Sequence, residues 1–72
     1  MSVKERLKEY IHLKKISTRQ FEIQLGLSNG YINNIKKSIS RATLENISMK
    51  HPNLNLEWLL LGEGEMLKGG VV

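Results

Sequence analysis

Residues 17–37 read STRQFEIQLGLSNGYINNIKK, and this stretch decides the fold of the chain. Ser17 is a favoured N-cap residue, so it predicts the start of a helix over residues 18–25. Gly26 follows at the position where a left-handed residue ends a helix without a Cβ clash. Ser28 is another N-cap residue, and it predicts that a second helix opens directly after the turn. The stretch therefore predicts two short helices joined by a tight turn.

Apolar residues in this stretch recur at the spacing of helices that bury one face. Phe21 and Leu25 are four residues apart, and Ile32 and Ile35 are three apart. Leu27, inside the turn, is expected to fill the gap between the two helices and to fix their crossing. We therefore expect one side of each helix to face the core.

An alternative interpretation is a β-hairpin, because Asn-Gly between apolar runs is a strong hairpin signal. Asn29 and Gly30 form such a pair. The apolar residues before the pair do alternate, as a strand requires: Ile23, Leu25 and Leu27. Those that follow, Ile32 and Ile35, do not alternate. We therefore favour a second helix over residues 28–37.

An earlier helix is expected at the start of the chain. Ser2 and Glu5 have the spacing of a capping box. An apolar stripe follows them at helical spacing and indicates a helix that ends near Leu13. The residues of this stripe are Val3, Leu7, Tyr10 and Ile11.

Two more helices are expected after the central stretch. Ser40 is a further N-cap residue and predicts a helix over residues 41–50. Asn55 caps a short final helix, which Gly62 ends. The chain as a whole is thus expected to contain five helices.

Length and composition fit a single globular domain. The chain has 72 residues, of which 40% are hydrophobic and 25% charged, as in ordinary folded proteins. Glycines accumulate toward the C-terminus and indicate a loosening end. We expect a compact all-α domain over residues 1–67, and a flexible tail or the start of a linker over residues 68–72.

Residue content argues against several classes of function. The chain has no cysteine, which excludes disulfides, thiolate catalysis and cysteine-based zinc sites. His12 and His51 lie far apart in the sequence, so no metal site is expected. The chain also lacks aspartate, a glycine-rich phosphate loop and a plausible catalytic triad. We therefore expect no enzyme activity, no cofactor and no small-molecule substrate.

Membrane association is not expected either. The first residues are charged and no apolar segment follows them, so a signal peptide is absent from the pattern. The longest apolar run, from Trp58 to Leu61, is far too short to span a bilayer. We expect a cytoplasmic, nucleoid-associated protein.

Charge is unevenly distributed along the chain. Residues 1–50 carry ten Lys or Arg and four Glu, a net of +6, whereas residues 51–72 have a net of −2. Between Leu25 and Leu44 the chain has no acidic residue, and its three cations there are Lys36, Lys37 and Arg41. A polyanion would be attracted to this part of the chain. The plain alternative is a solvated basic surface without a nucleic-acid partner.

The central stretch resembles the helix-turn-helix of lambda-repressor-like (Xre-type) transcriptional regulators. A later run, NLNLEWLLLGEGEML at residues 53–67, is similar to a segment that follows the DNA-binding helices in many phage-repressor-like proteins. Together the similarity extends over Val3 to Leu67. It implies a sequence-specific regulator of phage-repressor type that binds double-stranded DNA, as a homodimer on a near-palindromic operator. The helix at 28–37 would lie in the major groove.

The resemblance also implies roles for individual residues. Those at base-reading positions are Asn29, Gly30, Asn33 and Asn34. An Asn amide can pair with adenine, and Gly30 would let the backbone approach closely. Those expected at DNA phosphates are Thr18, Arg19, Ser28, Tyr31, Lys36, Lys37 and Arg41. Phosphate contacts of this kind give affinity without sequence choice.

Two positions depart from the family pattern. Many members have Gln at the position of Thr18, which leaves the phosphate contact there in doubt. Many have a small residue at the position of Glu22. Its carboxylate must turn outward or reach a partner, such as a lysine or a backbone N–H. Because a carboxylate near DNA would be repelled, we expect Glu22 to point away from it.

Other interpretations of these residues remain open. The Asn pair at 33 and 34 can be a plain polar helix face, and Tyr31 can be a half-buried residue at the rim of the core. Near the C-terminus, three apolar residues belong either to the core or to a dimer or partner surface: Trp58, Leu60 and Leu61. The alternative function is a protein-interaction module, such as the antitoxin of a toxin–antitoxin pair.

Overall fold

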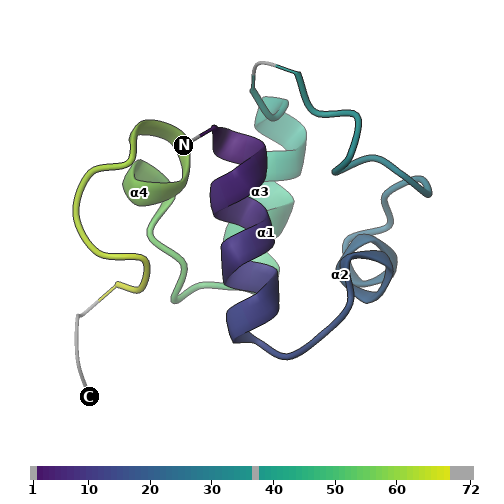
Figure 1. Ribbon diagram of the computed structural model, residues 1–72, viewed down its shortest axis with the longest axis horizontal. Coiled ribbons are helices and arrows are strands. Elements are labelled where there is room, and N and C mark those ends of the chain that lie inside the picture. The colour runs from purple at the N-terminus through teal and green to yellow at the C-terminus, as the bar shows by residue number, and fades with distance from the viewer. Residues whose placement is uncertain (1, 37, 69–72) are drawn as a thin grey trace.

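The computed structural model describes residues 2–36 and 38–68, and it confirms an all-α fold (Figure 1). Its helices are α1 (Val3–Leu13), α2 (Thr18–Gln24), α3 (Arg41–Lys50) and α4 (Leu56–Leu61). The described residues contain no β-strand, and the hairpin is therefore absent as well. One isolated antiparallel bridge pairs Leu54 with Leu67 and returns the C-terminal segment to the domain.

Side-chain caps set where the helices begin, largely as predicted. The Ser2 hydroxyl accepts the Glu5 N–H at 3.2 Å, and the Glu5 carboxylate accepts the Ser2 N–H at 3.0 Å. The same reciprocal box forms between Ser17 and Gln20, with both bonds at 3.0 Å. Each box satisfies donors that the first turn of a helix leaves without a partner. Single side-chain bonds cap the other two helices, from Ser40 and Asn55.

The core lies around α1, which runs between α2 on one side and α4 on the other (Figure 1). The whole apolar stripe of this helix is buried, as predicted: Val3, Leu7, Tyr10 and Ile11. Phe21, Ile47 and Leu59, from the other three helices, are completely buried. Two residues of the connections are buried as well, Ile39 and Leu54, and the sequence pattern did not single them out. All four helices and two of the connections therefore contribute to one small core.

The helix that was predicted over residues 28–37 does not form, and this is the main correction to the predicted fold. The backbone runs through successive turns over residues 29–34. Gly30 has φ +84°, far from the value of about −60° that a helix requires. The N–H groups of Tyr31 and Ile35 bond to carbonyls three residues back rather than four, at 3.1 and 3.2 Å. The domain therefore has four helices among the described residues, not five, and Lys37 lies outside them.

The turn before this segment follows the prediction closely. Gly26 has φ +69°, and its N–H bonds to the carbonyl of Ile23 at 3.1 Å. The Leu27 N–H bonds to the carbonyl of Glu22 at 2.8 Å. This pair of bonds is the Schellman arrangement, in which a left-handed glycine closes the end of a helix. Leu27 is partly buried against the core, which agrees with its expected position between the elements.

His51 is half-buried beside two aromatic rings. Its ring lies 5.0 Å from that of Phe21, nearly parallel to it, and 5.4 Å from that of Tyr10, edge-on. Its Nδ1 atom lies 3.0 Å from the Tyr10 hydroxyl, and its buried Nε2 atom has no partner within the described chain. Burial of the ring, together with the nearby Lys14 ammonium, lowers the pKa of His51 below its ordinary value of 6.5. His51 therefore packs with two aromatic residues of the core, whereas His12 is exposed.

Stability should decrease in mild acid because of His51. A lowered pKa means that the unfolded chain binds this proton more readily than the folded protein. The free energy of unfolding is thus expected to fall as pH drops below 6.5, and to continue falling until pH passes the lower pKa of the folded state. Chemical denaturation between about pH 8 and about pH 5.5 measures this slope. His51→Gln should be less stable at high pH but less pH-sensitive, and His12→Gln should behave as the unmodified protein. An unchanged slope in His51→Gln would contradict this account.

Candidate nucleic-acid interface

Residues 28–36, here called the turn segment, form an edge of the molecule between α2 and α3 (Figure 1). Ile32 anchors the segment because its side chain is completely buried, and Ile35 packs partly against the core. The side chains of Asn29, Asn33 and Asn34 are exposed. The segment therefore buries Ile32 against the core and exposes three amides.

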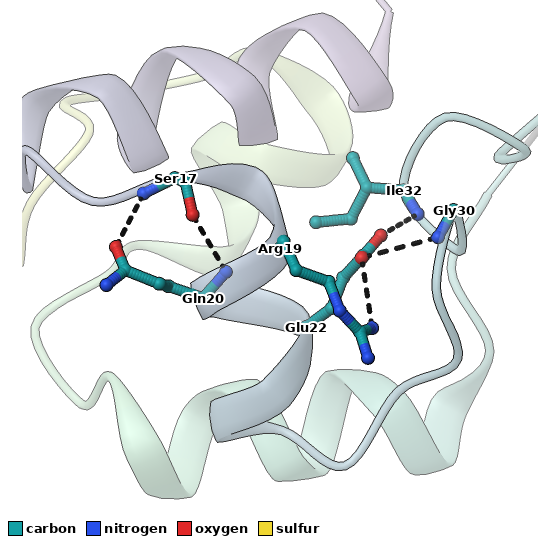
Figure 2. Close-up of polar contacts among 6 residues, drawn as sticks. All are labelled: Ser17, Arg19, Gln20, Glu22, Gly30 and Ile32. Atoms are coloured by element: carbon teal, nitrogen blue, oxygen red, sulfur yellow. Dashed lines mark hydrogen bonds and ion pairs between the residues drawn. The ribbon is translucent and has the colours of Figure 1, made fainter.

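Glu22 holds the turn segment from the inside instead of turning outward to solvent. Its side chain is only 1% exposed. One carboxylate oxygen accepts the Gly30 N–H at 3.3 Å, and the other accepts the Ile32 N–H at 3.1 Å. Figure 2 shows the carboxylate of Glu22 directed from α2 toward these two amide nitrogens. Of the alternatives that the sequence left open for Glu22, the backbone N–H partner is the one that forms.

Arg19 completes this cluster on the solvent side. Its guanidinium lies 3.6 Å from the Glu22 carboxylate, and its side chain is 51% exposed (Figure 2). The buried negative charge therefore faces two N–H dipoles and one cation. Both kinds of partner are needed, because an unpaired carboxylate is costly to bury.

The role expected for Gly30 changes with this geometry. Its N–H donates to Glu22, so the N–H faces the protein and is engaged there. Glycine is nonetheless required, because φ +84° is strained for a residue with a Cβ. The Asn34 side chain lies alongside, with its Nδ2 atom 3.7 Å from where a Cβ of residue 30 would stand.

Tyr31 joins the turn segment to the start of α3. Its ring is partly buried, and its hydroxyl donates to Thr43 Oγ1 at 3.1 Å. The Ser40 hydroxyl donates to the same Thr43 oxygen at 2.9 Å. Tyr31 thus lies at the rim of the core, and a DNA phosphate would have to replace Thr43 as the acceptor of its hydroxyl proton.

Several cations surround the outer side of the segment. Lys36 and Arg41 are exposed, and Lys37 falls outside the described residues. Lys4, at the start of α1, donates from Nζ to the Asn33 carbonyl at 3.2 Å. The sequence analysis did not select Lys4, because 29 residues separate it from Asn33 and no local pattern connects them.

The remaining phosphate candidates lie at the start of α2 and at the start of the turn segment. Thr18 is half-buried in the first turn of α2, and Ser28 is exposed. The capping box of α2 already satisfies the Gln20 N–H, so fewer donors are available there than the sequence suggested. A pocket of about 510 Å³ lies beside Ser28, and it is lined by Ser28, Tyr31, Asn34, Ile35, Lys36 and Ser38.

The three apolar residues near the C-terminus divide between the core and the surface. Trp58 and Leu60 are partly buried and pack against the core. Leu61 is 67% exposed at the end of α4. In the described part of the chain, no helix has the length and apolarity needed to cross a membrane.

Comparison with protein-family models, with curated proteins and with solved structures finds no significant match to this chain.

Alanine at position 30 should destabilise the protein through the backbone alone. The nearest atom to a new Cβ would be 3.7 Å away, so there is room for it, but φ is unfavourable. We expect Gly30→Ala to lower the free energy of unfolding by about 1–2 kcal/mol, measured by chemical denaturation. Gly26→Ala is the matched control, because it has positive φ and no neighbour within 4 Å, and it should lose a similar amount. A loss near zero for Gly30→Ala would contradict the left-handed turn.

Proposed function

We propose that this protein is a sequence-specific regulator of transcription, of phage-repressor type, that reads the major groove of double-stranded DNA with its turn segment. The main support for this proposal is that Asn29, Asn33 and Asn34 are exposed on a segment that the core and Glu22 hold from the inside. In this proposal the domain is lambda-repressor-like, with an irregular turn segment in place of the second helix of the helix-turn-helix.

The chemistry of the three amides supports base reading. An Asn side chain offers a donor and an acceptor side by side, which match N6 and N7 of adenine in the major groove. One such pair contributes about 1–3 kcal/mol of discrimination against a wrong base. Asparagine also favours turns over helices, so three of them suit a segment that is not helical.

The surrounding cations support contact with the DNA backbone. Lys36, Arg41 and Arg19 are exposed in or near the turn segment, and Lys4 reaches its Asn33 carbonyl. No exposed carboxylate interrupts residues 25–44, because that part of the sequence has no acid. We assign the phosphate contacts to these cations, with Lys37, Thr18 and Ser28 as further candidates. The pocket beside Ser28 and Lys36 offers space for a phosphate group.

We further propose that two copies bind together on a near-palindromic operator. A single turn segment covers only a short half-site, and a dimer would place two of them about 34–36 Å apart. Leu61, exposed beside partly buried Leu60 and Trp58, is the candidate centre of the contact between copies.

Selection of bound sequences from a random duplex pool tests the proposal directly. The unmodified chain is expected to recover a near-palindromic consensus. The double variant Asn33→Ala, Asn34→Ala should lose that preference and retain only weak, salt-sensitive binding of roughly 10⁻⁴–10⁻⁶ M. Asn53→Ala is the matched control, since Asn53 is exposed in the connection between α3 and α4. Failure to recover any consensus with the unmodified chain would overturn the proposal, and full preference in the double variant would overturn the assignment of the amides.

The salt dependence of binding tests the phosphate contacts. Lys36→Gln should weaken binding to all sequences, and it should reduce the slope of log affinity against log salt by about 0.9, the value for one phosphate. Titrations of one duplex at several salt concentrations measure that slope. Lys50→Gln is the control, because Lys50 ends α3 and lies at the opposite end of this helix from Arg41. Equal slopes for Lys36→Gln and the unmodified protein would remove Lys36 from the interface.

A further inference from the structure

Glu22 is a buried acid that the proposed function does not use, in a protein with a net charge of +4. Burial of a carboxylate in a small core is unfavourable unless hydrogen bonds and opposite charge compensate it. Glu22 has both kinds of partner, and its two hydrogen bonds lead to the same segment. The contact therefore stabilises the conformation of residues 28–36 rather than that of α2.

The turn segment depends on an acceptor from outside itself. In a regular helix the Ile32 N–H would bond to the Ser28 carbonyl, but here that carbonyl accepts the Tyr31 N–H at 3.1 Å. The Ile32 N–H donates instead to a carboxylate oxygen of Glu22 at 3.1 Å. The N–H of Gly30, whose φ is positive, bonds to the other carboxylate oxygen.

These bonds fix the part of the segment that bears the amides. Gly30 and Ile32 alternate with Asn29, Tyr31 and Asn33, so holding the two N–H groups inward sets the direction of the residues between and beside them. Asn34 adds a further link, because its side chain lies next to Gly30. A change of this backbone by a small rotation would move all three amides together.

We propose that Glu22 is a positioning residue for base reading, which holds the turn segment so that its three amides meet the base edges in one arrangement. This inference rests on the proposed DNA-binding function. Glu22 does not touch DNA in this account, since its carboxylate is buried and directed at the segment from behind. Its effect should therefore appear in discrimination between sequences rather than in general affinity.

Glu22→Gln is the variant that separates these effects. It preserves the volume of the side chain, but replaces one of the two acceptor oxygens with an NH₂ group, so in the same position one of the two N–H groups would face a donor. It also removes one negative charge, which alone would strengthen attraction to any DNA. Glu45→Gln makes the same change of charge at an exposed position of α3 and serves as the matched control.

The experiment compares affinity for the selected operator with affinity for a scrambled duplex of equal length and composition, at one salt concentration and well below the melting temperature. For Glu22→Gln, the ratio of the two affinities is expected to fall about tenfold, while affinity for the scrambled duplex is unchanged or tighter. For Glu45→Gln the ratio should be unchanged. A role in stability alone would leave the ratio of a folded variant intact, so a ratio within about twofold of the unmodified protein would overturn the inference.

Amide hydrogen exchange tests the inference in the unmodified protein, so the result does not depend on how well Glu22→Gln folds. The Gly30 and Ile32 amides should remain protected when the operator is bound, since the carboxylate is required in the complex. Faster exchange of both amides in the complex would overturn the inference. Absence of any preferred duplex for the unmodified chain would instead overturn the proposed function, and the inference with it.

Discussion

The apolar stripe of α1 is the constraint on which the rest of this small protein depends. A chain of this size buries only about 60% of the surface that its unfolded form exposes, so each large apolar side chain matters. Leu7 and Tyr10 are each 1% exposed, and the residues packed around them come from every later helix. Removing one such side chain typically costs about 2–5 kcal/mol, a large part of the total stability of a domain. Each of the three later helices contributes a completely buried side chain to the core that this stripe joins.

Two polar side chains of α1 connect this helix to α4 and to the turn segment. The Arg6 guanidinium donates to the carbonyls of Leu59 and Leu60 at 2.8 and 3.1 Å. These carbonyls belong to the last turn of α4, where helix acceptors lack partners of their own. Lys4, two residues earlier, reaches the Asn33 carbonyl in the turn segment. One helix thus connects the candidate interface to the C-terminal helix, and it does so with side chains that the apolar pattern would assign to solvent.

The sequence predicted the features that depend on contacts within one helical turn, and it missed those that depend on residues farther apart in the chain. Helix starts were predictable because Ser2 and Glu5 meet within one turn, so the pattern and the contact span the same few residues. The helix over 28–37 was wrong because its conformation depends on Glu22, eight and ten residues before the amides that it accepts. The burial of Leu54 was not predicted for a similar reason. Its burial depends on pairing with Leu67, and a lone leucine in a connection has no periodicity to indicate it.

The irregular backbone has a consequence for how this surface can recognise a ligand. The N–H groups of Gly30 and Ile32 are satisfied inside the protein, so recognition on the outer side must come from side chains. Amides and cations are what the segment presents there, and its nearest carboxylate is enclosed between two N–H dipoles and the Arg19 guanidinium. A negative charge compensated in this way has little reach into solvent, whereas the exposed cations act on any approaching polyanion. The Glu22 carboxylate therefore fixes the backbone of this surface from inside, while the cations of the surface stay exposed to solvent.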